Sequence, residues 1–140
     1  MAREIQRGQA FLRRSQENIL RAFGFLQDAG FSLQDAQVSR EAWVQFRSDT
    51  KEITLMHEPW DLPELRITQI HAARNKSEVL ELPKTIMDSA AAKTFRRQRD
   101  AGPEGRVLRS LDDGAHDDLI NSVIAHYASR VAETLGIPEQ

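Results

Sequence analysis

Apolar and polar residues alternate most regularly at the centre of the chain, in residues 42–58 (AWVQFRSDTKEITLMHE). A period of two residues is typical of a β-strand with one face in the core. The polar run Ser48–Lys51 interrupts the alternation and predicts a turn between two strands. We therefore predict that the apolar residues of this hairpin lie in the core, namely Val44, Phe46, Ile53 and Leu55.

Weaker alternation on both sides extends the predicted sheet. Residues Phe31–Ser39 predict a first strand, but Asp35 and Gln37 interrupt its apolar row, which favours an edge position or a bulge. Residues Leu65–Ala72 predict another strand after a proline-flanked loop. Residues Glu78–Leu82 predict either a fifth strand or the start of a helix.

Apolar residues spaced three and four apart predict helices at both ends of the chain. The first runs from about residue 9 to 29 and stops before Gly30, which suits a left-handed helix end. A second helix, from about 84 to 99, has Pro83 before its first turn. The last runs from about 115 to 135 and ends at Gly136.

A run of strands between helices, without alternation of the two, predicts an α+β fold. We expect an antiparallel sheet of four or five strands with the N-terminal helix and two C-terminal helices on one face. The 140 residues suit a single domain, 1–140.

Composition places few limits on function. Hydrophobic residues make up 40% and charged residues 29%, with a net charge of −2, as in ordinary globular proteins. The absence of cysteine excludes disulfides, thiolate catalysis and cysteine-based metal sites. No apolar run is long enough to cross a bilayer, and the N-terminal residues MAREIQRGQAFLRRSQ are too polar for a signal peptide. We therefore expect a cytoplasmic protein without a membrane partner.

Catalytic motifs are missing from the sequence. It contains no phosphate-binding loop, no dinucleotide fingerprint and no serine-nucleophile elbow. Its histidines lack the spacing of a metal site, so we expect neither a metal nor a cofactor. His57 and His71 lie on strands that are expected to pair, so an enzyme site between them is a third hypothesis. The alternative, which we prefer, is an ordinary buried and hydrogen-bonded histidine.

Basic residues gather between Lys93 and Arg109, with the densest run at RRQR. Such a cluster can contact phosphates, which gives a second hypothesis of nucleic-acid binding or regulation through Arg96, Arg97, Arg99 and Arg106. Cations are also favoured at helix C-terminal ends, and we prefer that explanation. Nucleic acid is therefore not the partner we expect.

Acidic residues prevail from Asp28 to Glu64, with eight negative against three positive side chains. Trp43 shares the more polar face of its strand with Gln45 and Arg47, which favours exposure over burial beneath a helix. An acidic surface with exposed aromatic residues suits a basic protein partner. The predicted partner-binding residues are Trp43, Asp49, Glu52, Glu58, Trp60 and Asp61. The edge strand also allows a homodimer.

The order of these elements resembles that of small bacterial immunity proteins that neutralise toxins. The likeness covers roughly Ile19–Ile70 and includes a helix ending in Ala29-Gly30-Phe31, a meander containing Val44-Gln45-Phe46, and a helical tail. It is a likeness of architecture. It implies a non-catalytic protein that binds one toxin domain, with the acidic sheet surface as the binding region, and this is our first hypothesis.

Overall fold

The computed structural model describes residues 2–59, 61–71, 73, 76–80, 82, 86, 89–100 and 114–137. Helix α1 (Ala2–Ala22) and the short helix α2 (Phe25–Asp28) precede the strands, and helices α3 (Ala90–Asp100) and α5 (Gly114–Leu135) follow them. The strands are β1 (Ser32–Val38), β2 (Ala42–Arg47), β3 (Lys51–His57), β4 (Glu64–His71) and β5 (Lys76–Val79). The predicted α+β class is confirmed.

The five strands form one antiparallel sheet in the order β1-β2-β3-β4-β5. In the central hairpin Val44 pairs with Leu55 and Phe46 with Ile53, so the apolar residues of both strands share one face. The register of β1 shifts between Leu33 and Asp35. The expected hairpin, edge strand and bulge are therefore all present.

The first helix differs from its prediction at both ends. It begins at Ala2 rather than at about residue 9, and it ends at Ala22, after which α2 forms a separate turn. At this break the N–H of Gly24 donates to the carbonyl of Arg21, three residues back instead of four. Such tightening is frequent at helix ends. Gly30 has a φ of 93°, in the left-handed region expected for a helix stop.

The remaining elements agree with the sequence pattern, with shifted bounds. The segment predicted at Glu78–Leu82 is a strand, β5, which begins two residues earlier. Helix α3 begins at Ala90, and residues 83–85, 87 and 88, where we expected the helix to start, lie outside the described residues. Helix α5 ends as predicted, with Gly136 at a φ of 66°.

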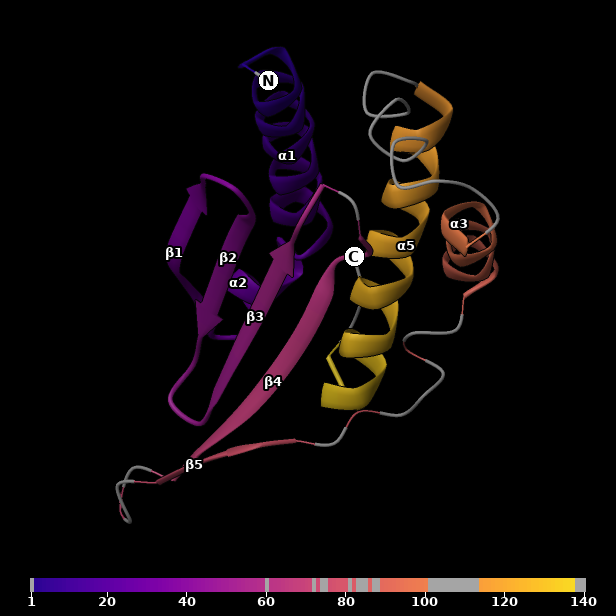
Figure 1. The fold of residues 1–140 in the computed structure, drawn as a ribbon. Helices are drawn as coiled ribbons and strands as arrows, with labels where there is room; N and C mark the ends of the chain where they lie inside the picture. Colours follow the sequence, from indigo (N-terminus) through magenta and orange to yellow (C-terminus); the bar gives the residue numbers. More distant parts are fainter. Residues whose placement is uncertain are drawn as a thin grey trace.

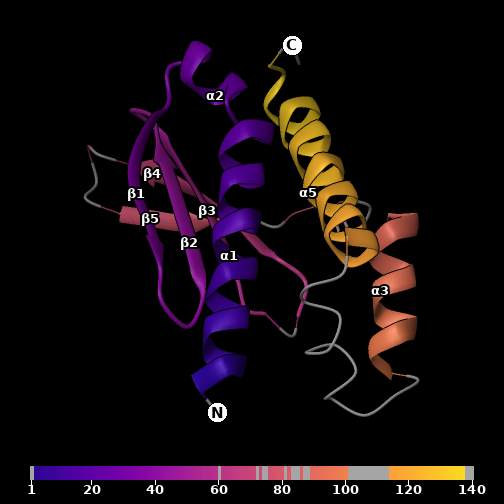
Figure 2. The same ribbon diagram turned by 90° about the horizontal axis from the view of Figure 1, so that it is seen from above.

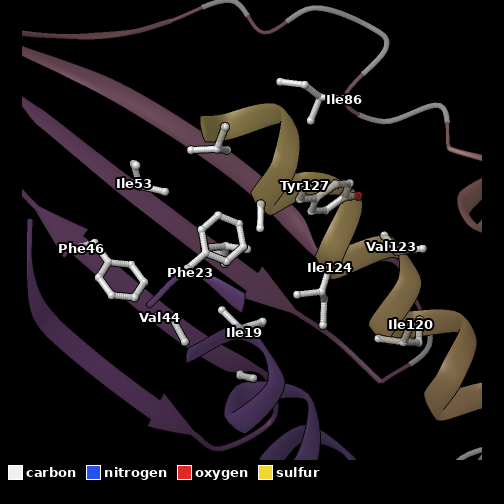
Figure 3. Packing of buried hydrophobic residues seen from close by; sticks show 14 of the residues in the cluster. Ile19, Phe23, Val44, Phe46, Ile53, Ile86, Ile120, Val123, Ile124 and Tyr127 are labelled. Atoms are coloured by element: carbon white, nitrogen blue, oxygen red, sulfur yellow. The ribbon is translucent and has the colours of Figure 1, made fainter. Parts of the chain in front are cut away.

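All the described helices lie on one side of the sheet (Figures 1 and 2). Helix α1 crosses β1 and β2, α5 lies beside α1, and α3 packs on the outer side of α5. The core fills the space between the sheet and helices α1 and α5, and Figure 3 shows Phe46 and Ile53 facing Phe23, Ile124 and Tyr127. No described helix covers the opposite face of the sheet, here called the outer face.

Polar contacts also join the two long helices. The Nε of Arg14 on α1 donates to Oδ2 of Asp117 on α5 at 2.8 Å. One turn further along, Nδ2 of Asn18 donates to Oδ1 of Asn121. These contacts fix the register of α1 against α5.

Two residues that face each other across β1 and β2 test the assignment of the core. Phe46 is 1% exposed and its cross-strand neighbour Leu33 is 40% exposed. Phe46→Ala should lower the free energy of unfolding by about 3–5 kcal/mol because it leaves a cavity. Leu33→Ala, the matched control, should change it by no more than about 1 kcal/mol. Urea denaturation measures both, and equal losses would contradict the assignment.

Candidate protein-binding site

The connection from β3 to β4 joins the sheet to both long helices. It follows His57, the last residue of β3, and it carries Glu58 and Asp61. In Figure 1 the end of β3 points toward α1 and α5. The conformation of this connection is set by two buried side chains, one from the sheet and one from α5.

His57 is the first of these side chains. It is fully buried, its Nε2 lies 2.9 Å from the backbone carbonyl oxygen of Asp61, and its Nδ1 lies 2.6 Å from Oγ of Ser15 on α1. A carbonyl oxygen only accepts, so Nε2 must carry the proton. In the neutral ring Nδ1 is then an acceptor, and the Ser15 hydroxyl donates to it. The ring thus connects α1 to the β3–β4 connection in a defined tautomer.

The surroundings of His57 favour its neutral form. The ring of Phe11 packs edge-on against it with 5.4 Å between centroids. Burial lowers the pKa of His57 from 6.5 to about 4, the hydrogen bond to Asp61 opposes this shift, and His116 adds to it. Because the positive charge is excluded by desolvation, this histidine is a neutral structural group near pH 7.

Tyr127 holds the connection from the other side. Its hydroxyl donates to the carbonyl oxygen of Pro63 at 2.9 Å, and burial raises its pKa above the ordinary value of 10. Within the connection, the backbone N–H of Leu62 donates to Oδ1 of Asp61 at 2.7 Å. His57 of β3 and Tyr127 of α5 therefore bond to the connection directly, and Ser15 of α1 holds the His57 ring in place. Such support is what a preorganised surface site requires.

A cavity of about 220 Å³ opens beside this connection. Three carboxylates line it, those of Glu58, Asp61 and Glu64, together with Arg96 from α3. Met56, Leu62 and Pro63 form its apolar part. With three negative charges and one positive charge, the cavity favours cationic groups.

A smaller hollow of about 90 Å³ continues from this cavity onto the outer face. Trp43 and Arg66 contribute to it, and it shares Met56 and Glu64 with the first cavity. Trp43 and Met56 are direct cross-strand neighbours, and both are half-buried. Together the two hollows form the acidic groove, which we define by Trp43, Met56, Glu58, Asp61 and Glu64.

The acidic groove contains only part of the site predicted from the sequence. It brings together Trp43, Glu58 and Asp61, whereas Trp60 lies outside the described residues. Glu52 lies across from Arg47, toward the other end of the hairpin, and Asp49 lies in the turn beyond. The strand register thus separates these predicted residues and places Arg47 opposite Glu52.

The basic cluster predicted at 93–109 is also divided. Arg96 is half-buried and lines the acidic groove's cavity, where it faces carboxylates. Arg97 is exposed, and its guanidinium lies 3.4 Å from Oγ1 of Thr94. The side chain of Arg99 and the whole of Arg106 lie outside the described residues. Arg96 and Arg97 thus have different environments and do not share one phosphate-binding surface.

The proposed enzyme site between His57 and His71 is contradicted by the register of β3 and β4. Met56 pairs with Glu64 at one end of these strands, and Lys51 pairs with Gln69 near the other. At about 3.3 Å per residue the two histidines lie roughly 25 Å apart along the strand direction. A serine does lie beside His57, but Ser15 is 2% exposed and the pair is closed to substrate. A buried, hydrogen-bonded histidine is the correct alternative.

Sequence reasoning missed three residues that shape the site. Glu64 was counted as acidic, but only its pairing with Met56 shows that it belongs beside Trp43. Ser15 and Tyr127 appeared as parts of helices. The alternation of residues along the strand could have indicated the face of the sheet on which Glu64 lies. Nothing in the sequence links Ser15 to His57, which lies 42 residues away.

Comparisons with protein-family models, with curated proteins and with solved structures give no match for this chain. Within the described residues, no helix is both long and apolar enough to cross a membrane. The same part of the chain contains no group of three or more histidine or acidic side chains placed to hold a metal ion.

Stability should decrease as the pH falls from 6.5 toward 4. The unfolded chain protonates His57 near 6.5 and the folded protein only near 4, so the unfolded state binds more protons between these values. The contribution of neutral His57 to the free energy of unfolding is fully present above pH 6.5 and is lost by about pH 4. It amounts to about 3 kcal/mol. Urea denaturation at a series of pH values measures it. His57→Gln, which keeps one donor and one acceptor, should have a flatter profile, and identical profiles would contradict the assignment.

Ser15→Ala should lower the free energy of unfolding by about 1–3 kcal/mol because it leaves the buried Nδ1 of His57 without its donor. Ser122→Ala is the matched control, since Ser122 is exposed on α5 and donates to the carbonyl of Asp118 in its own helix. That control should change stability by no more than about 0.5 kcal/mol. Equal stability of the two variants would show that the Ser15 hydrogen bond is dispensable.

Proposed function

We propose that this protein is a non-catalytic binding module whose acidic groove receives a basic segment of a protein partner. The observation that carries the proposal is the groove itself. It combines three carboxylates, which outnumber the two arginines Arg66 and Arg96, with Trp43 and Met56 at the border of a sheet face that no described helix covers. Carboxylates of this kind steer a basic partner, and half-buried aromatic and methionine side chains provide apolar contact.

The rigidity of the groove supports binding more than catalysis. His57 and Tyr127 hold the backbone of the β3–β4 connection from two sides, so little order has to be gained on association. The pair formed by Ser15 and His57 is buried, and its hydrogen bond connects α1 to β3. The carboxylates that remain at the surface have the charge to attract lysine or arginine side chains.

The narrower form of the proposal is an immunity-type protein, and it rests on the architectural likeness described above. Its partner would be a toxin domain with a basic surface, such as a nuclease, because a surface that binds nucleic acid carries Lys and Arg. The acidic groove would then cover that surface. A toxin gene next to the gene of this protein would be the first partner to test.

Charge reversal separates the acidic groove from the rest of the acidic residues. Glu58→Lys combined with Glu64→Lys should weaken partner binding about tenfold or more, because two attractive contacts become repulsive. Glu52→Lys is the matched control, since Glu52 lies outside the groove. The measurement is the Kd for the purified product of the neighbouring gene, by titration calorimetry.

Two results would overturn this assignment. Full binding by the double variant would exclude the groove, and a loss of binding that is confined to Glu52→Lys would move the site to the other end of the hairpin. Circular dichroism of each variant verifies that the fold is intact. If the neighbouring product does not bind but another basic partner does, the narrower proposal fails and the general one stands.

A further inference from the structure

Strand β1 forms one edge of the sheet, and no described strand pairs with the side of β1 that faces away from β2. Natural edge strands are commonly protected from further pairing by short length, lysine or proline. The opposite edge, β5, has four residues and carries Lys76 and Glu78. Strand β1 has seven residues, and Asp35 is its only charged one. It is therefore the less protected edge.

The side chain of Gln16 on α1 shows in which direction the backbone of β1 points. Its Nε2 donates to the carbonyl oxygen of Gln37 at 3.0 Å and to that of Trp43 at 3.3 Å, and these two residues pair across β1 and β2. One nitrogen reaches both oxygens only if both carbonyls point into the space between the two strands. Because backbone groups alternate in direction along a strand, the N–H and C=O of Ala36 and Val38 point to the free edge.

Helix α1 also leaves the inner face of β1 partly open. Val44 and Phe46 on β2 are fully buried. Their cross-strand neighbours on β1, Ala36 and Leu33, are exposed, and the exposed fraction of Leu33 is 40%. Apolar side chains next to unpaired backbone groups are typical of an edge that can accept another strand. The helix therefore leaves space for such a strand beside β1.

We infer that β1 pairs antiparallel with β1 of a second copy of this chain, about a twofold axis at Ala36. Paired residues face the same side of a sheet, so the axis passes through a residue and not between two residues. An axis at Asp35 would place two carboxylates opposite each other, and an axis at Gln37 would use fewer residues of β1. The axis at Ala36 pairs residues 34–38 of both copies, and Ala36 exchanges two hydrogen bonds with its counterpart.

The side chains around this axis are self-complementary. Asp35 lies opposite Gln37 of the second copy, and the reverse pair forms on the other side of the axis. Within one chain, Nε2 of Gln37 donates to Oδ2 of Asp35 at 2.7 Å. The amide has a second hydrogen and the carboxylate has further acceptor sites, so both groups can also bond across the axis. A second copy thus matches the free edge in backbone and side chains, and the inference does not depend on the proposed basic partner.

Sedimentation equilibrium of the full chain tests the inference, and we expect an equilibrium between monomer and dimer. Ala36→Pro should raise the dimer Kd about tenfold or more, because it removes the N–H that each copy donates across the axis. Proline is compatible with β1 at this position, since that N–H points away from β2. Ala36→Ser, the matched control, keeps the N–H and should leave the Kd unchanged.

Substitutions at Gln37 test the register by the sign of their effect. Gln37→Lys places a cation opposite Asp35 of the second copy and should lower the Kd about fivefold. Gln37→Glu places a carboxylate there and should raise the Kd by a similar factor. Ser77, which is exposed on β5, supplies the matched controls. Ser77→Lys and Ser77→Glu should leave the Kd unchanged.

Four results would overturn the inference. They are a chain that stays monomeric up to about 1 mM, equal dimer stability of Ala36→Pro and Ala36→Ser, effects of the same sign for the two Gln37 variants, and a dimer that responds to the Ser77 variants instead. Circular dichroism verifies that each variant is folded. The Gln37 variants decide the matter on their own if Ala36→Pro does not fold.

Discussion

The structure depends on one buried contact, in which the His57 ring lies between the Ser15 hydroxyl and the Asp61 carbonyl. This ring joins α1, the end of β3 and the β3–β4 connection, three segments that are distant in sequence. A buried polar group is costly unless its hydrogen bonds are made, so the three segments must adopt one relative position. Tyr127 adds the same constraint from α5.

This constraint explains why the acidic groove is located beside the β3–β4 connection. His57 and Tyr127 hold the backbone of this connection from the protein interior, at Asp61 and Pro63. The acidic side chains beside it are therefore presented outward at fixed positions. The helices all pack on the inner face, which leaves the outer face for contact with other molecules.

Much of the fold follows from local pattern, because period and end signals are properties of neighbouring residues. Alternation in residues 42–58 predicts the hairpin and its core, and Gly30 and Gly136 predict helix ends. The candidate site is much less predictable from local pattern, because it depends on the register in which the strands pair. Charge counted along the sequence joined Glu52 to Asp61, whereas pairing places Glu52 across from Arg47 and brings Glu64 beside Met56. The contact between Ser15 and His57 requires the packing of α1 on the sheet, which no local pattern encodes.

The tautomer of His57 tests this account most directly. A long-range nitrogen–proton NMR spectrum of the histidine rings near pH 7 distinguishes the two ring nitrogens. The account predicts a neutral ring with the proton on Nε2, whose signal persists because the donor is buried against Asp61. A neutral ring with its proton on Nδ1 would contradict the account, because Nε2 would then have no proton to donate to the Asp61 carbonyl. A positively charged ring at this pH would also contradict it, because burial disfavours the charge.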